Sequence, residues 1–258
     1  MIKLVTFNVL CSDNKGGLTI ADRAPLVKKT LDALDADVIG LQEVTEKWVP
    51  YIEEYYGAEY EFFNKWRKST NHESTPILWK KDRFDCLEKG YFWLSDTPTF
   101  EYGEPWDERF HCTRICMWVK LWDKKEEKSF TFFNTHYGFG GEYQARSSAM
   151  ILSYMKALGG PCFVTADFNM CEGTPGYLKF TERLVDVNAA TVNDPRATYN
   201  GFKDDPYICK PGDLCFITPE TITPITSKLI REKVDGKFAS DHYAVYYELE
   251  IQKEGEES

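Results

Sequence analysis

Polar side chains suited to phosphate chemistry adjoin short strand-like runs at several points of this 258-residue chain. They are carboxylates, amides and imidazoles, and the most prominent are Asn8, Glu43, His136, Asp167, Asn169, Asp241 and His242. A sheet that presents such groups at neighbouring strand ends can hold a hard cation and a phosphate in fixed geometry. The pattern therefore predicts a metal-assisted reaction at phosphorus.

Glu43 is the strongest candidate for a direct metal ligand, because its carboxylate follows a predicted strand. Asn8 and Asp241 are expected to lie close to it and to act as further metal ligands. Oxygen ligands of this kind suit Mg²⁺ or Mn²⁺ and leave coordination positions for water and substrate, so we expect one or two divalent ions. Taken alone, Glu43 could equally be an acid that caps a helix beginning near Thr45. The other motifs favour metal binding.

Asp167 and Asn169 form a second candidate pair. They lie two residues apart, so on an extended chain both side chains point to the same side. Asp167 could then take a proton from an attacking water while the Asn169 amide holds the phosphate or the nucleophile. The alternative is an ordinary turn, since Asp and Asn favour turns. The absence of Gly and Pro from Asp167-Phe168-Asn169 disfavours that interpretation.

Apolar runs and their periodicity predict the elements that must position these groups. Strands are predicted at 2–7, 37–41, 75–80, 114–121, 129–135, 162–166, 213–217 and 243–250. Amphipathic helices, the second of them capped by Thr45, are predicted at 20–34, 45–56 and 142–158. Residues 94–112 predict a long surface loop. We expect one domain over 1–251 and a disordered tail over 252–258.

Six motifs taken together resemble the endonuclease/exonuclease/phosphatase superfamily, the metal-dependent phosphoesterases that include pancreatic-type deoxyribonuclease. They are FNVL at 7–10, LQEV at 41–44, NTHYG at 134–138, ADFN at 166–169, GDLCFIT at 212–218 and SDH at 240–242. Their order and spacing match over essentially the whole chain. ESTPILW at 73–79 and FWLS at 92–95 resemble a bacterial branch of unassigned substrate.

The resemblance implies an α/β fold, a four-layer sandwich of two packed, mostly antiparallel β-sheets flanked by helices, with the active site at one end. It implies that Asp167 is the base, that Asn169 is the positioning amide, and that His242 contacts the scissile phosphate. Asp213 would fix the tautomer of His242 and favour its protonated form. The reason is that a carboxylate within hydrogen-bond reach raises a histidine pKa.

His136 corresponds to the second histidine of the family pattern, with Glu73 as its candidate partner. Considered alone, a histidine beside a core strand could equally be a satisfied core residue. The remaining histidines, His72 and His111, lie outside the motifs and are expected to face solvent.

Candidates for substrate binding are less specific. Arg114 and Arg146 match arginine positions of the bacterial branch and could bind phosphate oxygens bidentately. Either could instead form a structural ion pair, which is the favoured interpretation for Arg146. Tyr137, Trp106 and Phe110 could form a stacking wall for a base or sugar, or they could be core and loop anchors.

Composition limits the substrates and partners that we expect this protein to bind. The net charge of −10 and the pI near 5.0 disfavour stable binding to duplex DNA, so we expect a short nucleic acid or a small phosphodiester as substrate. No apolar run is long enough to span a membrane. The chain begins without the features of a signal peptide, so we expect a cytoplasmic monomer whose eight cysteines are reduced. Cys112 and Cys116 lack further ligands for a zinc site.

Two classes of function are compatible with the sequence. The first is a divalent-metal-dependent phosphoester hydrolase, a phosphodiesterase, nuclease or phosphatase, in which water attacks phosphorus directly. The second is a non-catalytic module that binds phosphate-containing ligands on the same fold. A module that had lost catalysis would be expected to lack one of the motif residues, and all of them are present. The sequence therefore favours the enzyme.

Overall fold

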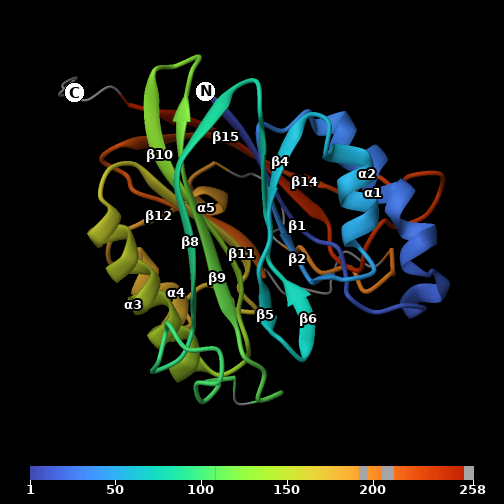
Figure 1. The fold of residues 1–258 in the computed structure, drawn as a ribbon, viewed down its shortest axis with the longest axis horizontal. Helices are drawn as coiled ribbons and strands as arrows, with labels where there is room; N and C mark the ends of the chain where they lie inside the picture. The colour runs from blue at the N-terminus through green and yellow to red at the C-terminus, as the bar shows by residue number, and fades with distance from the viewer. Residues whose placement is uncertain (108, 192–196, 205–211, 253–258) are drawn as a thin grey trace.

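Two β-sheets pack face to face in the computed structural model, which describes residues 1–107, 109–191, 197–204 and 212–252 (Figure 1). In that part of the chain, the first sheet has the strand order β14 (Ile222–Ile230), β15 (Ala244–Ile251), β1 (Ile2–Asn8), β2 (Val38–Gln42), β7 (Ile77–Lys80) and β4 (Tyr60–Phe63). The second has the order β12 (Val185–Asp186), β13 (Asp213–Ile217), β11 (Cys162–Asp167), β10 (Lys128–His136), β9 (Ile115–Asp123) and β8 (Phe84–Trp93). A small third sheet contains β3 (Val44–Thr45), β6 (Asn71–Ser74) and β5 (Trp66–Lys68).

Each large sheet is mostly antiparallel but contains a parallel pair near its centre. These pairs are β1 with β2 and β10 with β11. Parallel strands end at the same edge of a sheet, so the residues after the two strands of each pair become neighbours.

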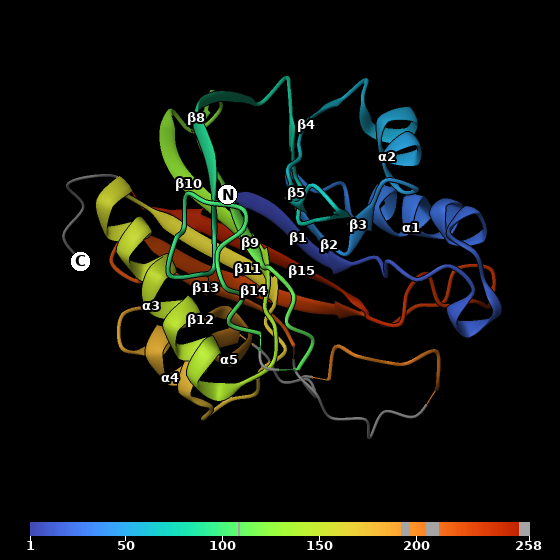
Figure 2. The same ribbon diagram turned by 60° about the horizontal axis from the view of Figure 1, so that its bottom comes forward.

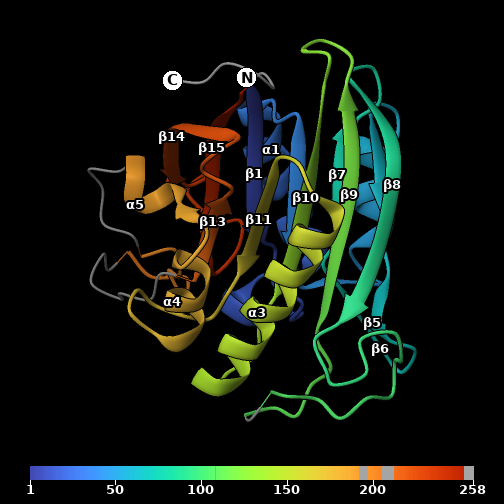
Figure 3. The ribbon, with the colours of Figure 1, turned by 90° about the vertical axis from the view of Figure 1, so that its left-hand side faces the viewer.

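Apolar side chains fill three layers. Leu4 and Val38 of the first sheet meet Met117 and Phe132 of the second in the central layer. The outer face of the first sheet packs against α1 (Ile20–Leu34) and α2 (Val49–Tyr56), and that of the second against α3 (Gly141–Leu158) and α4 (Pro175–Thr181). Figures 1 and 3 show these helices outside the strands. A short helix, α5 (Val187–Thr191), follows β12. The predicted four-layer sandwich is confirmed.

Helix α1 has the bounds that its periodicity predicted. Its start is a capping box: the Thr19 hydroxyl accepts a bond from the Asp22 amide at 3.1 Å, and the Asp22 carboxylate accepts one from the Thr19 amide at 2.9 Å. Both amides would otherwise lack partners at the helix start.

The prediction for the second helix was wrong at its start. Val44 and Thr45 form strand β3, which pairs with β6, and the helix begins only at Val49. Pro50 explains the difference, because proline fits the first turn of a helix but clashes with the preceding turn further in. A helix from Thr45 would have placed Pro50 in its interior.

Strands β8 and β14 were not predicted from the sequence. Both lie at sheet edges, and both contain a register shift, between Cys86 and Glu88 in β8 and between Pro224 and Thr226 in β14. The middle of β8 is exposed on both faces, so its residues do not alternate. Proline is tolerated only where no ladder bond is needed, as at such an edge.

A buried polar bridge joins the two sheets near the end that carries the motifs. The Gln42 amide donates to Asn134 Oδ1 at 2.7 Å, and the Asn134 amide donates to the Leu41 carbonyl at 2.8 Å. A Cβ at Gly40 would lie 2.7 Å from Asn134 Oδ1, so only glycine permits this approach. The bridge fixes the separation of the sheets beside the site.

Three further expectations concern the C-terminal tail, the cysteines and membrane-spanning helices. In the predicted tail, Gln252 donates its amide to the Thr221 carbonyl at 2.9 Å, and 253–258 lie outside the described residues. Seven cysteines are free thiols, and Cys209 falls in an undescribed stretch. Within the described chain, no helix combines the length and apolarity needed to cross a membrane.

Candidate active site

The ends of both parallel pairs meet at one edge of the sandwich. Asn8 lies beside Gln42 at the end of β1 and β2, and His136 lies beside Asp167 at the end of β10 and β11. Asp213 opens β13 directly opposite Asp167. Strand register therefore brings residues from distant parts of the chain to one place.

A pocket of about 820 Å³ opens at this edge. The residues of the sequence-based set that line it are Glu43, Glu73, Phe110, Arg114, His136, Asp167, Asn169, Asp241 and His242. Asn8 and Asp213 lie directly behind this wall, fully buried and bonded to residues of it. The sequence-based candidates therefore make up about half of the pocket lining.

Asn8 holds two carboxylates together. Its amide nitrogen donates to Glu43 Oε1 and to Asp167 Oδ2, both at 3.0 Å, while its Oδ1 accepts the Leu10 amide at 3.0 Å. Because one nitrogen serves both carboxylates, their oxygens lie close to each other. In this arrangement Asn8 orients the two acids.

Glu43 is ionised and held by neutral donors. Its Oε2 accepts the Cys11 amide at 2.8 Å, and its backbone adopts φ 60°, which side chains other than glycine seldom favour. Burial would raise the pKa of Glu43, but His136 whenever it is protonated, together with the hydrogen bonds from Cys11 and Asn8, lowers that pKa below its usual value. Backbone strain of this kind is concentrated at functional sites.

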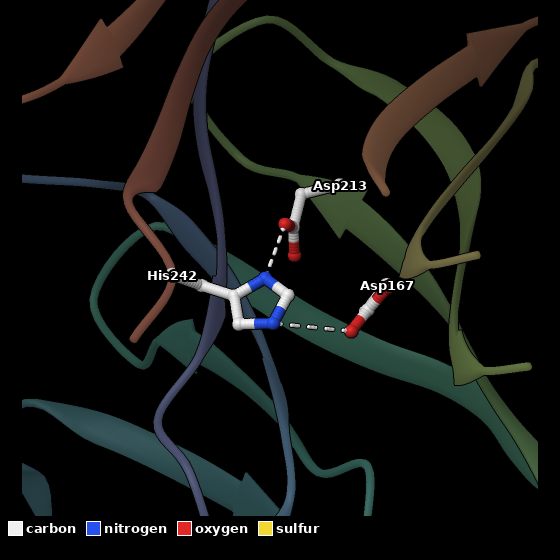
Figure 4. Close-up of side chains that lie close together, drawn as sticks. All are labelled: Asp167, Asp213 and His242. Carbon is white, nitrogen blue, oxygen red and sulfur yellow. Dashed lines mark hydrogen bonds and ion pairs between the residues drawn. The ribbon is translucent and has the colours of Figure 1, made fainter. Parts of the chain in front are cut away.

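His242 lies between two aspartates (Figure 4). Its Nδ1 is 2.7 Å from Asp213 Oδ2, and its Nε2 is 3.6 Å from Asp167 Oδ2. Burial would lower the pKa of His242, but Asp213 and Asp167 raise it to about 10. The ring is therefore an imidazolium at neutral pH, with its Nε2 proton directed at the pocket.

The surroundings of Asp167, in contrast, favour its neutral form. Burial raises its pKa to about 6, and Asp213 acts in the same direction, while His242 lowers it. Its Oδ1 accepts a hydrogen bond from the backbone amide of Asn169 at 3.0 Å, and its Oδ2 faces Asn8 and the pocket. A carboxylate with a pKa near neutrality is suited to accept a proton.

His136 is a neutral imidazole held by Asn169. The side-chain amide of Asn169 donates to His136 Nε2 at 3.1 Å and to the Tyr137 carbonyl at 2.9 Å. Because Nε2 accepts this bond, the ring proton lies on Nδ1. Burial and the nearby Arg114 hold the pKa of His136 well below its usual range. Its Nδ1 has no hydrogen-bond partner among the described residues and lies 3.9 Å from Glu73. The expected His136–Glu73 pair is thus too long for a hydrogen bond.

Glu73 is instead paired with Arg67, at 2.6 Å between Oε1 and Nη1. Both residues line the pocket, as does Lys15, whose ammonium lies 2.6 Å from Asp241 Oδ2. The sequence analysis missed Arg67 and Lys15. Neither lies in a recognisable motif. Lys15 is identified by its partner Asp241, 226 residues away, and Arg67 by its place in the pocket beside Glu73.

Arg114 is anchored by an aspartate within the predicted surface loop. Its Nε and Nη2 donate to Asp107 Oδ2 at 3.2 and 3.0 Å, and the Phe110 amide donates to the other Asp107 oxygen at 3.1 Å. Asp107 is fully buried, so the segment 94–112 is not surface throughout. A Cβ at Gly138 would lie 2.4 Å from the Asp107 carboxyl carbon, so glycine is required there.

Replacing Asp107 with Ala should lower the free energy of unfolding by about 3–5 kcal/mol, because it leaves Arg114 buried without its partner. Burial would raise the pKa of Asp107, but the Phe110 amide and Arg114 lower it below its usual value. The stabilisation is therefore present at neutral pH and is lost as pH falls through the lowered pKa. Urea unfolding of both proteins across that range measures it.

The matched control is Asp96→Ala, which removes the partner of Arg146 on the exposed surface. Its expected cost is only about 0–1 kcal/mol. Equal losses in the two variants would contradict the role given to Asp107.

Three of the substrate-binding candidates do not line the pocket. Tyr137 is fully buried among core aromatics, and its hydroxyl pairs with Ser148 at 3.2 Å, so its ring cannot stack on a substrate in this structure. Trp106 packs beneath Arg146, 4.1 Å from ring centre to guanidinium, and Arg146 pairs with Asp96. Arg146 therefore makes the structural ion pair that was favoured.

The donor set fits a hard divalent cation. Among the described residues, one group of acidic and imidazole ligand atoms lies within 4.8 Å of one another, formed by Asp167, Asp213 and His242. Both ring nitrogens of His242 already face carboxylates there, so an ion would have to displace a proton. Glu43 instead offers an ionised carboxylate with only neutral donors bound to it. Such an oxygen suits Mg²⁺ or Mn²⁺.

The sequence and the fold are similar to those of known proteins. The profile of the Endonuclease/Exonuclease/phosphatase family matches residues 5–242. An endonuclease/exonuclease/phosphatase from Bacteroides vulgatus is 25% identical with a TM-score of 0.89, over 97% of this chain and 99% of the other. No curated protein matches the sequence.

Two other solved structures share the fold at lower identity. The mannosyl-6-phosphatase Bt3783 of Bacteroides thetaiotaomicron is 24% identical with a TM-score of 0.82, over 96% of this chain and 99% of the other. D. rerio TDP2, complexed with single strand DNA product, is 20% identical with a TM-score of 0.75, over 96% and 98%. Endonucleases, exonucleases and phosphatases all hydrolyse phosphoesters, and a phosphoester hydrolase activity is what this membership supports. The chain belongs to the endonuclease/exonuclease/phosphatase family.

Proposed function

We propose that this protein is a divalent-metal-dependent phosphoester hydrolase in which water attacks phosphorus directly. The observation that carries the proposal is the convergence of Asp167, His242 and Glu43 on one pocket, in three different electrostatic states. A proton acceptor, a fixed cation and an ionised oxygen ligand are the groups that such a hydrolysis needs.

Glu43 would hold the metal ion, with Asn8 keeping its carboxylate in position. When bound there, Mg²⁺ or Mn²⁺ would neutralise phosphoryl oxygens and the charge that develops on them. The two ions share the oxygen ligands available here, so the donor set does not favour one over the other.

The residues of the chain divide the remaining work. Asp167 accepts a proton from the attacking water, whose oxygen bonds to phosphorus as the ester P–O bond breaks. The leaving oxygen takes up a proton from solvent, and Asp167 returns its own proton to solvent before the next turnover. His242 donates a charged hydrogen bond to a phosphoryl oxygen, and Asp213 keeps it protonated. Asn169 orients the nucleophile and fixes His136.

The substrate we propose is a small phosphoester or a short nucleic acid. The net charge of −10 opposes binding to long duplex DNA. In the pocket, Arg109 and the guanidinium groups of Arg67 and Arg114, which are each paired with an acid, offer donors to phosphate oxygens. Structural neighbours include a phosphatase acting on a mannosyl phosphate and a protein solved with a single-stranded DNA product. One domain over 1–251 and a monomeric state remain predictions.

Turnover of bis-p-nitrophenyl phosphate tests the proposal. We expect nitrophenol release with Mg²⁺ or Mn²⁺, loss of activity after chelation, and recovery when the ion is restored. Glu43→Gln should raise the metal concentration for half-maximal activity by roughly 10–100-fold, because it removes the charge of the ligand. Glu46→Gln, an exposed glutamate outside the pocket, is the matched control.

Two outcomes would count against the proposal. Turnover that survives chelation would contradict metal dependence. Absence of turnover with Mg²⁺, Mn²⁺ and Ca²⁺, for diesters and monoesters alike, would favour the non-catalytic phosphate-binding module.

A further inference from the structure

Asp241 is buried and already has a positively charged partner. Its side chain is 3% exposed, its Oδ2 lies 2.6 Å from the Lys15 ammonium, and its Oδ1 is 3.4 Å from the Ser240 hydroxyl. A buried carboxylate is costly unless a charge of opposite sign is close to it. Lys15 supplies that charge.

Lys15 comes from a turn that the fold holds in place. The Arg23 guanidinium, itself fully buried, donates to the Leu10 carbonyl at 3.1 Å and to the Ser12 carbonyl at 2.7 Å. Gly16 has φ 68°, and a Cβ there would lie 2.5 Å from the Phe202 ring. The turn is therefore held at Leu10 and Ser12 by Arg23 and contacts Phe202 at Gly16, while the Lys15 side chain itself is 47% exposed.

The Lys15 ammonium also faces the reaction centre. It lies 5.9 Å from the centre of the Tyr199 ring, which is 5.1 Å from the His242 ring. Figure 2 shows the first turn after β1 and the chain leading into β15 near each other, although they are far apart in sequence.

The other acidic groups of the site have basic partners, with one exception. Glu73 pairs with Arg67 at 2.6 Å, Asp213 with His242 at 2.7 Å, and Asp167 lies 3.6 Å from His242 Nε2. Glu43 accepts bonds from the Asn8 side chain and the Cys11 amide, and no ion pair to its carboxylate is found among the described residues.

We propose that the Lys15 ammonium takes the place that a second divalent ion would occupy at Asp241, so that the pocket binds a single divalent ion, at Glu43. This assignment differs from the sequence-based prediction, which made Asp241 a metal ligand. It rests on the proposed function only in that the pocket binds a divalent ion. Its readout is the number of ions bound and does not depend on turnover.

Titration with Mn²⁺, followed by the electron paramagnetic resonance of the free ion, counts the bound ions. We expect one Mn²⁺ per chain for the wild type and two for Lys15→Met, which keeps the side-chain length and removes the charge. Lys15→Arg, which restores the charge, should return the count to one. Lys47→Met is the matched control, because Lys47 pairs with Asp13 on the surface near the same turn and should keep one ion.

Asp241→Asn and Glu43→Gln separate the two carboxylates. Asp241→Asn should keep the single ion with its affinity changed less than about 3-fold, whereas Glu43→Gln should weaken that ion by roughly 10–100-fold. Thermal unfolding of each variant confirms that the counts refer to folded protein.

Each alternative result has one meaning. Two ions per wild-type chain, one ion in Lys15→Met, or loss of the ion in Asp241→Asn would overturn this inference while leaving a metal-dependent hydrolase intact. A wild-type chain that binds no Mn²⁺ would overturn both the inference and the metal dependence of the proposed function.

Discussion

Replacing Asp167 with Asn should lower phosphoester turnover by about 10²–10⁴-fold, the usual contribution of a positioned proton acceptor. The asparagine side chain has the same shape but cannot take a proton from water. Burial raises the pKa of Asp167 to about 6, so in the wild type the group is ionised at neutral pH yet basic enough to act. Steady-state kinetics at saturating metal should show the loss chiefly in kcat, because the proton is transferred in the transition state.

A second buried aspartate controls for the loss of charge. Asp186, in β12, accepts a bond from the Tyr177 hydroxyl at 2.9 Å and lies outside the pocket. Asp186→Asn should leave kcat of the folded protein within about 3-fold of wild type. If Asp167→Asn retains wild-type turnover while folded and loaded with metal, Asp167 is not the proton acceptor.

Replacing His242 with Asn should also lower kcat/KM by about 10²–10⁴-fold, for a different reason. The substitution removes a fixed positive charge that faces the phosphate position, and asparagine supplies only a neutral donor. Asp213, 2.7 Å from His242 Nδ1, would then be left without its charged partner. The loss should be larger for a phosphomonoester dianion than for a diester monoanion, because the missing group is a cation.

Comparing the two substrate charges makes this prediction specific. A merely structural role for His242 would lower both activities by the same factor. His72, exposed and paired with Glu46 at 2.6 Å outside the pocket, provides the control His72→Asn, which should leave both unchanged. Equal losses for monoester and diester would argue against a direct contact between His242 and phosphate.

Much of the site was predictable because its groups stand beside strands. Asn8, His136 and Asp167 are the last residues of their strands, and the apolar runs that form those strands are local features of the sequence. The motif resemblance supplied the order in which these strands assemble. Once β1 pairs with β2 and β10 with β11 in parallel, the polar residues at their ends must meet.

Local sequence patterns did not predict the structure correctly where contacts with other residues determine it. Thr45 looked like a helix cap, but Pro50 delays the helix and β3 pairs with β6 instead. Tyr137 looked available for stacking because it follows His136, yet its side chain points into the core between the second sheet and α3. Strand β8 has no alternation to recognise, because it lies at an edge.

The sequence by itself determined the class of fold, the strand ends that carry the acids and histidines, and the kind of chemistry that those groups support. Only the tertiary structure decided which charges are paired. Lys15 and Asp241 are 226 residues apart, and Arg114 depends on an aspartate inside a segment that looks like surface loop. Ion pairs such as these leave no periodic trace in the sequence, because the partner of each charge is set by how the whole chain packs.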